Sequence, residues 1–288
     1  ASRSSTPPLA RGRPMLPGPP AAAPVGTFCP LGPPAEAGAT PRRGRFCRAI
    51  DIGSGSGFLG KFVAAYAPGD GGLDVTLVDI DRSALEYCRT PGFNAPLQGL
   101  NGRRIRWQYE AKDAVQLLKQ DADYDLLVSN PPYIPTEKET RDDTISEGVA
   151  GFWEGVGLVV YLIGLLAEQK CRDGAHLVLM ITSLTLKSVS VRRALEDARA
   201  RGLRVRVLTE HEIAWKAWYA GPCGGTDHLL ATAQEAGSRQ EIGGNSYYVG
   251  ATPPGRSRTG LDGRDQLYGY HWHVAYVLCV YRPDAPDG

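Results

Sequence analysis

The sequence predicts an α/β fold built on a doubly wound, mostly parallel sheet of seven strands. From residue 46 onward, short apolar segments alternate with amphipathic segments, a glycine-rich turn follows the first apolar segment, and a polar turn ends the fourth. Alternation of this kind is typical of strands joined by crossover helices, which places successive strands parallel to one another. At 288 residues the chain has room for one large domain of this type.

Seven segments have the length and apolar pattern of strands. They are 46–51, 74–78, 105–109, 124–129, 175–181, 203–208 and 273–281. The five segments predicted as helices are 58–66, 83–89, 114–119, 155–169 and 188–201. Ser83 is a suitable N-cap for the second of these helices. The glycine-rich, weakly periodic stretch 221–269 reads as an insertion before the last strand, and we expect it to shape a substrate pocket.

The first 45 residues have a different composition from the remainder. They contain six arginines, one acid and eleven of the 22 prolines, and they show no hydrophobic period. We therefore predict a disordered tail over 1–45 and a folded domain over 46–288. An arginine-rich, acid-poor start also fits an organelle-targeting segment, but the prolines oppose the amphipathic helix that such a segment needs.

Charge and cysteine usage narrow the class of protein. Residues 46–288 carry 26 basic and 30 acidic side chains, a net charge of −4, so they lack the basic surface typical of nucleic-acid-binding proteins. The six cysteines are scattered without a C-x-x-C pair, which favours a reducing cytoplasm and predicts no metal site. The longest apolar run, 156–167, is shorter than the roughly 20 residues of a membrane span and predicts a buried helix.

The glycine-rich turn indicates a nucleotide-like ligand. Gly53, Gly55 and Gly57 follow Asp51 at the end of the first strand, where a ligand of a parallel sheet binds. Glycines allow a sharp turn and a close approach to that ligand. The G-x-G-x-G spacing differs from the G-x-G-x-x-G of dinucleotide enzymes, which argues against a dinucleotide oxidoreductase.

Acidic residues follow the next two strands. Asp79 ends the second strand, where an acid can accept hydrogen bonds from both ribose hydroxyls. Asp81 is a second candidate for this role and also a candidate cap for the next helix. Asp113 follows the third strand and is also a candidate for contacting the ligand. A role as the N-cap of the helix that begins at 114 explains this residue equally well.

The polar turn Asn130-Pro131-Pro132-Tyr133 indicates the reaction. Two prolines fix φ and remove two N–H groups, which produces a rigid turn with outward carbonyls. A planar NH2 group can donate to the Asn130 side-chain oxygen and the Pro131 carbonyl, while Tyr133 stacks on it. These bonds strengthen as charge develops on the nitrogen, which is the pattern expected of transition-state stabilisation.

These motifs together resemble the class I, Rossmann-like S-adenosylmethionine (SAM) dependent methyltransferases. The run 129–135, with its trailing Ile134-Pro135, resembles the HemK/PrmC family of release-factor glutamine methyltransferases. The resemblance implies SAM as cofactor, with Asp51 near its ammonium group, Asp79 on its ribose and Asp113 at its adenine amine. The chain departs from that family in its first 45 residues, which cannot form the helical domain that grips the release factor, and in the 221–269 insertion.

We therefore predict an N-methyltransferase whose acceptor is a protein glutamine amide, with a translation release factor as the expected partner. The alternatives are an exocyclic amine of adenine or guanine in RNA or DNA, and a non-catalytic SAM-binding subunit. Three further features have mostly structural interpretations. They are the pair His271 and His273, expected on the sheet surface, the aromatic cluster at 210–219, and Phe152-Trp153, which could cover the acceptor.

Overall fold

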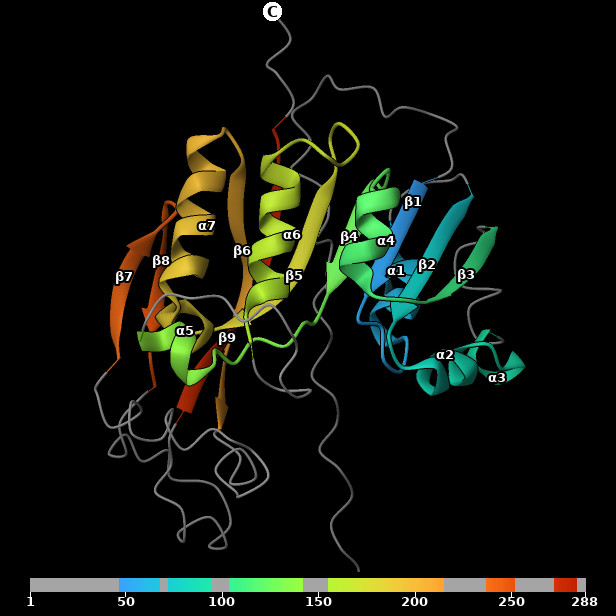
Figure 1. The fold of residues 1–288 in the computed structure, drawn as a ribbon, viewed down its shortest axis with the longest axis horizontal. Helices are drawn as coiled ribbons and strands as arrows, with labels where there is room; N and C mark the ends of the chain where they lie inside the picture. Colours follow the sequence, from blue (N-terminus) through green and yellow to red (C-terminus); the bar gives the residue numbers. More distant parts are fainter. Residues whose placement is uncertain are drawn as a thin grey trace, which may run out of the picture.

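The computed structural model describes residues 47–67, 72–94, 104–141, 155–214, 237–251 and 272–283 (Figure 1). The predicted tail 1–45 and most of the predicted insertion 221–269 lie outside these ranges. Within them, no helix is long and apolar enough to cross a membrane.

The seven predicted strands form one sheet in the order β3-β2-β1-β4-β5-β9-β6. Neighbouring strands from β3 to β5 pair in parallel, and β9 runs antiparallel to both β5 and β6. This topology confirms the predicted fold class. The strands are β1 (Cys47–Ile52), β2 (Leu73–Asp79), β3 (Ile105–Ala111), β4 (Leu126–Ser129), β5 (His176–Thr182), β6 (Arg204–Ala214) and β9 (Trp272–Tyr281).

Helices cover both faces of the sheet because strand side chains alternate between two cores. Ile50 and Ile52 belong to the larger core with α4, α6 and α7, whereas Ala49 belongs to the smaller core with α1 and α2. Figure 1 shows α4, α6 and α7 in front of the sheet. The helices are α1 (Phe58–Tyr66), α2 (Arg82–Cys88), α3 (Pro91–Asn94), α4 (Ala114–Gln120), α5 (Glu137–Arg141), α6 (Gly157–Ala167), the 3-10 turn η2 (Thr185–Lys187) and α7 (Val189–Ala200).

Two expectations need correction. Helix α2 is capped by Asp81, not by Ser83, because an Asp81 oxygen accepts hydrogen bonds from both the backbone N–H of Ser83, at 2.8 Å, and its hydroxyl, at 2.6 Å. His273 does not lie on the sheet surface but is buried, with 2% of its surface exposed. Burial lowers its pKa to about 4, so its imidazole is neutral. His271 lies outside the described residues.

The described part of the insertion is a β-hairpin that the hydrophobic period does not reveal. Strands β7 (Ser238–Ile242) and β8 (Asn245–Val249) pair antiparallel, and Ile242 and Tyr247 join the larger core. Gly243 and Gly244 form the two-residue turn with φ of 55° and 84°. Positive φ at both central positions is the requirement of a type I′ hairpin turn.

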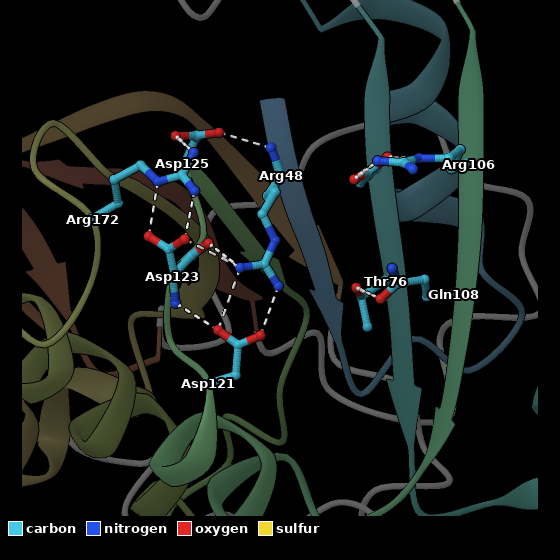
Figure 2. Close-up of polar contacts among 9 residues, drawn as sticks. Arg48, Thr76, Arg106, Gln108, Asp121, Asp123, Asp125 and Arg172 are labelled. Carbon is cyan, nitrogen blue, oxygen red and sulfur yellow. Dashed lines mark hydrogen bonds and ion pairs between the residues drawn. The ribbon is translucent and has the colours of Figure 1, made fainter. Parts of the chain in front are cut away.

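An ionic network closes the amino-terminal ends of the central strands (Figure 2). Arg48, on β1, contacts Asp121 at 2.7 Å and Asp123 at 3.3 Å, and Arg172, before β5, contacts Asp123 at 2.6 Å and Asp125 at 2.8 Å. The backbone N–H of Arg48 also donates to Asp125 at 2.7 Å. These five residues are called the amino edge below.

Candidate functional site

The candidate site lies at the opposite, carboxyl-terminal ends of β1, β2 and β4. In the sheet register, Ile52 of β1 is opposite both Val78 of β2 and Ser129 of β4. The Ser129 hydroxyl donates to the Ile52 carbonyl at 2.8 Å inside the core. The glycine turn after β1 and the Asn-Pro-Pro-Tyr turn after β4 therefore begin side by side, as expected for a ligand crevice in a parallel sheet.

The glycine loop, residues 53–57, needs its three predicted glycines for their backbone conformation, and Gly57 also for lack of space. Gly53, Gly55 and Gly57 all have positive φ, of 65°, 49° and 70°, where side chains are strained. A Cβ on Gly57 would also lie 2.7 Å from Phe93 and 2.8 Å from Cys88. A Cβ on Gly53 or Gly55 would meet no atom within 4 Å. The loop is thus packed on its Gly57 side and open where a ligand would approach Gly53 and Gly55.

Asp51 is a buried acid that contacts the first turn of α1. Only 1% of its surface is exposed, and its Oδ2 accepts a hydrogen bond from the Gly60 N–H at 2.7 Å. Burial raises the pKa of this carboxyl to about 7, and the nearby charge of Asp79 contributes in the same direction. The carboxyl can therefore gain or lose its proton near neutral pH.

Asp79 connects the ends of β2 and the glycine loop. Its Oδ2 accepts from the Gly55 N–H at 2.7 Å and its Oδ1 accepts from the Asp81 N–H at 2.8 Å. Asp81 is committed to capping α2. Asp113 caps α4, accepting from the Gln116 N–H at 3.0 Å. Both capping interpretations are therefore realised in the structure, and Asp79 is the acid that directly contacts the glycine loop.

The Asn-Pro-Pro-Tyr turn combines an exposed polar end with a buried base. Asn130 is exposed, and its side chain forms no hydrogen bond with any of the described residues, whereas Pro131 is buried. The Tyr133 carbonyl accepts from the Thr185 hydroxyl at 2.5 Å, and the Ile134 carbonyl accepts from the Gly155 N–H at 2.6 Å. The turn is held through its second half, which leaves Asn130 available to a ligand.

Two features of the site were missed by the sequence prediction. Ile80 lies between Asp79 and Asp81 with 71% of its surface exposed. It offers an apolar surface beside the predicted ribose position. The pattern of one apolar residue between two acids could have indicated this surface from the sequence. Glu139 is only 1% exposed and accepts from the Thr136 N–H at 2.7 Å and the Val156 N–H at 3.2 Å. Thr136-x-x-Glu139 is a capping box at the start of α5, a pattern that sequence can show.

The remaining candidates do not join the site in the described part of the chain. His211 is exposed on β6 and contacts Thr209 at 3.0 Å. Trp215, Trp218 and the pair Phe152-Trp153 lie outside the described residues. Among the described residues, no group of three or more histidine, cysteine or acidic side chains could hold a metal ion.

Known proteins resemble the segment that carries this site. Residues 40–150 match the family model "Methyltransferase small domain". The release factor glutamine methyltransferase of Chlorobaculum tepidum is 36% identical over 113 residues, which cover 38% of this chain and 34% of that protein. The tRNA1(Val) (adenine(37)-N6)-methyltransferase of Aeromonas hydrophila is 33% identical over 98 residues, covering 33% of this chain and 36% of that protein.

The "eRF1 methyltransferase catalytic subunit mtq2" of Schizosaccharomyces pombe is 26% identical over 144 residues, covering 48% of this chain and 61% of that protein. Among solved structures, the N-terminal domain of human METTL16 has a TM-score of 0.34 and 17% identity, covering 81% of this chain and 61% of that chain. The chain spans about a third of the length of the first two relatives. The resemblance predicted from the motifs is confirmed: residues 40–150 are similar to the methyltransferase small domain, and the relatives that match this chain carry the names of methyltransferases.

Proposed function

We propose that this protein is a SAM-dependent N-methyltransferase acting on a planar nitrogen. The observation that carries this proposal is the register of β1 with β4, which brings the glycine loop and the Asn-Pro-Pro-Tyr turn together. A methyl transfer requires a cofactor site beside a site that orients the acceptor nitrogen. The two turns supply these two sites from adjacent strand ends.

The residues present fit SAM at the carboxyl ends of β1 and β2. The open backbone at Gly53 and Gly55 leaves space for the methionine portion, and Gly57 shapes the loop. Asp79 would accept from the ribose hydroxyls, and the exposed Ile80 would contact the adenine ring, with Asp113 near its amine. Asp51 would act on the ammonium group through the loop or a water molecule, since its side chain is buried.

Asn130, Pro131 and Tyr133 would orient the acceptor. The Asn130 side-chain oxygen and the Pro131 carbonyl accept hydrogen bonds from the NH2 group, and the Tyr133 ring stacks on the planar group. When bound, SAM would supply a sulfonium methyl group to the acceptor nitrogen, and its sulfur would take the electron pair of the broken carbon–sulfur bond. The surplus proton on nitrogen leaves to water at the exposed Asn130 end of the turn. Orientation alone can supply about 7–11 kcal/mol of such a barrier.

The acceptor we favour is a glutamine amide of a translation release factor. Two relatives described above carry names of release-factor methyltransferases, and the net charge of −4 over residues 46–288 favours a protein over a nucleic acid. The tRNA adenine methyltransferase relative supports a second candidate, an exocyclic base amine. The scattered cysteines, three of which are free in the described residues, fit a reducing compartment such as the cytoplasm.

Incubation with methyl-labelled SAM and purified acceptors tests these assignments. The acceptors are a bacterial release factor, a eukaryotic release factor and unmodified tRNA, each with wild-type protein and with Asn130→Ala. Label on a release factor that depends on Asn130 supports the first candidate, and label on tRNA supports the second. SAM binding by calorimetry without transfer to any acceptor would favour the non-catalytic subunit instead.

A further inference from the structure

We propose that Thr185, on η2, is a positioning residue for the Asn-Pro-Pro-Tyr turn. Its hydroxyl holds the Tyr133 carbonyl, and through it the orientation of the groups that bind the acceptor nitrogen. This inference rests on the proposed function and deepens it, because it assigns a role at the same site to a segment that follows a different strand. Thr185 and Tyr133 are 52 positions apart in the sequence.

The directions of the hydrogen bonds around Thr185 follow from its single hydroxyl proton. The Tyr133 carbonyl can only accept, so the Thr185 hydroxyl donates to it, at 2.5 Å. Thr185 Oγ1 therefore accepts from the Thr182 N–H at 2.9 Å and from the Thr182 hydroxyl at 3.1 Å. Thr182 Oγ1 in turn accepts from the Thr185 N–H at 3.3 Å. The Thr185 proton thus has one acceptor, and both lone pairs of its oxygen are occupied.

The position of Thr185 is fixed by its surroundings. Thr182, Ser183 and Thr185 are all fully buried. The Ser183 hydroxyl donates to the Gly250 carbonyl at 2.6 Å and accepts from the Val274 N–H at 3.0 Å, which connects the end of β5 to the β7–β8 hairpin and to β9. A donor held by this many buried contacts has little freedom, so the carbonyl that it contacts is held with it.

The turn depends on such contacts because of its own composition. Pro131, Pro132 and Pro135 have no N–H, so external groups must hold this segment largely through its carbonyls. The Tyr133 and Ile134 carbonyls accept from Thr185 and from Gly155 respectively. Thr185 acts on the peptide next to the Tyr133 side chain, three residues from Asn130. Within the described part of the chain, its hydrogen bonds reach neither the glycine loop nor Asp79. Its removal should therefore affect turnover more than cofactor affinity.

The test compares Thr185→Val, which removes the hydroxyl at nearly constant volume, with Thr185→Ser, which keeps it. Thr76→Val is the matched control, because Thr76 is also buried and its hydroxyl contacts Gln108 at 3.4 Å, between β2 and β3 (Figure 2). We expect Thr185→Val to lower kcat roughly 10- to 100-fold, the scale of a small misplacement of reacting groups. KM for SAM should stay within about twofold. Thr185→Ser should recover most of kcat.

Hydrogen exchange provides a second readout that needs no acceptor. Peptides covering 130–136 should exchange faster in Thr185→Val than in wild type, Thr185→Ser or Thr76→Val. The positioning role would be overturned if Thr185→Val left the exchange of these peptides unchanged. It would also be overturned if Thr185→Val and Thr76→Val lowered the melting temperature equally and Thr185→Val lost no more kcat than Thr76→Val. Absence of transfer by the wild-type protein to every acceptor tested counts against the proposed function, and the exchange rates still decide whether Thr185 holds the turn.

Discussion

Aspartates have opposite environments at the amino-terminal and the carboxyl-terminal ends of the sheet strands. At the amino edge, three aspartates lie within hydrogen-bonding distance of two arginines. At the carboxyl-terminal ends of β1 and β2, called the carboxyl edge below, neither Asp51 nor Asp79 forms an ion pair with a lysine or arginine of the described residues. Both accept hydrogen bonds from backbone N–H groups instead. Charges that neutralise one another stabilise a fold, whereas acids without a cationic partner leave a negative potential for a cationic ligand.

The pKa values follow this difference. The hydrogen bonds from Arg172 lower the pKa of Asp123 to about 2, and burial raises the pKa of Asp51 to about 7. A lowered pKa means that the folded state favours the charged carboxylate, and a raised pKa means that it disfavours it. The charged form of Asp51 is therefore held at a cost in stability, a pattern that is common at functional sites.

The largest effect should come from the exposed end of the turn. Asn130→Ala removes one preorganised acceptor of the NH2 hydrogen bond, and we expect turnover to fall about 10²- to 10³-fold. SAM affinity, measured by calorimetry, should stay nearly constant because Asn130 lies on the other strand end. A collapse of cofactor affinity together with turnover would contradict the acceptor role.

A smaller effect is expected at the acid that contacts the glycine loop. Asp79→Ala removes both the ligand acceptor and the two backbone hydrogen bonds, so SAM affinity should fall roughly 10- to 100-fold, the value of one or more hydrogen bonds to a charged group. Asp79→Asn is the matched control, since its one remaining oxygen can still accept from Gly55. Equal affinity of wild type and Asp79→Ala would place the ribose elsewhere.

The raised pKa of Asp51 predicts pH dependence of both binding and stability. Only the ionised carboxylate attracts a cation, so SAM affinity should rise up to about tenfold per pH unit below pH 7 and level off above it. The folded state favours the protonated acid, so this group stabilises the free protein below about pH 4, and that contribution is lost as the pH rises through 7. Asp51→Asn should flatten both profiles, and a steep affinity profile in that variant would assign the titration to another group.

The amino edge should show the smallest effect, and only on stability. Arg172→Met removes two ion pairs of partly exposed groups, which we expect to cost about 1 kcal/mol of unfolding free energy without changing turnover. Because the folded pKa of Asp123 is depressed, its contribution is present above about pH 4 and is lost as the pH falls toward 2. The difference between wild type and variant in urea melts should therefore vanish at low pH. A change in turnover would show that the two edges are coupled.

Much of the fold could be predicted because local patterns were strong. The strand β1, the helix α1 and the glycines between them follow from apolar period and backbone freedom alone. Ser83 and Asp81 are both good N-caps, and the residue that caps α2 depends on where β2 ends and the chain turns. The β7–β8 hairpin escaped detection because β7 is mostly exposed and polar, although its Gly243-Gly244 turn was a readable signal.

The sequence by itself determined the individual strands, the glycine loop and the Asn-Pro-Pro-Tyr turn, because each depends on residues that are neighbours in the chain. Tertiary structure decided which groups act on one another. The strand register brings Ile52 beside Ser129, and the buried Thr185 reaches Tyr133 across 52 positions. It also set the charge state of Asp51, since a raised pKa is caused by burial, and burial arises only when distant segments pack around the carboxyl group.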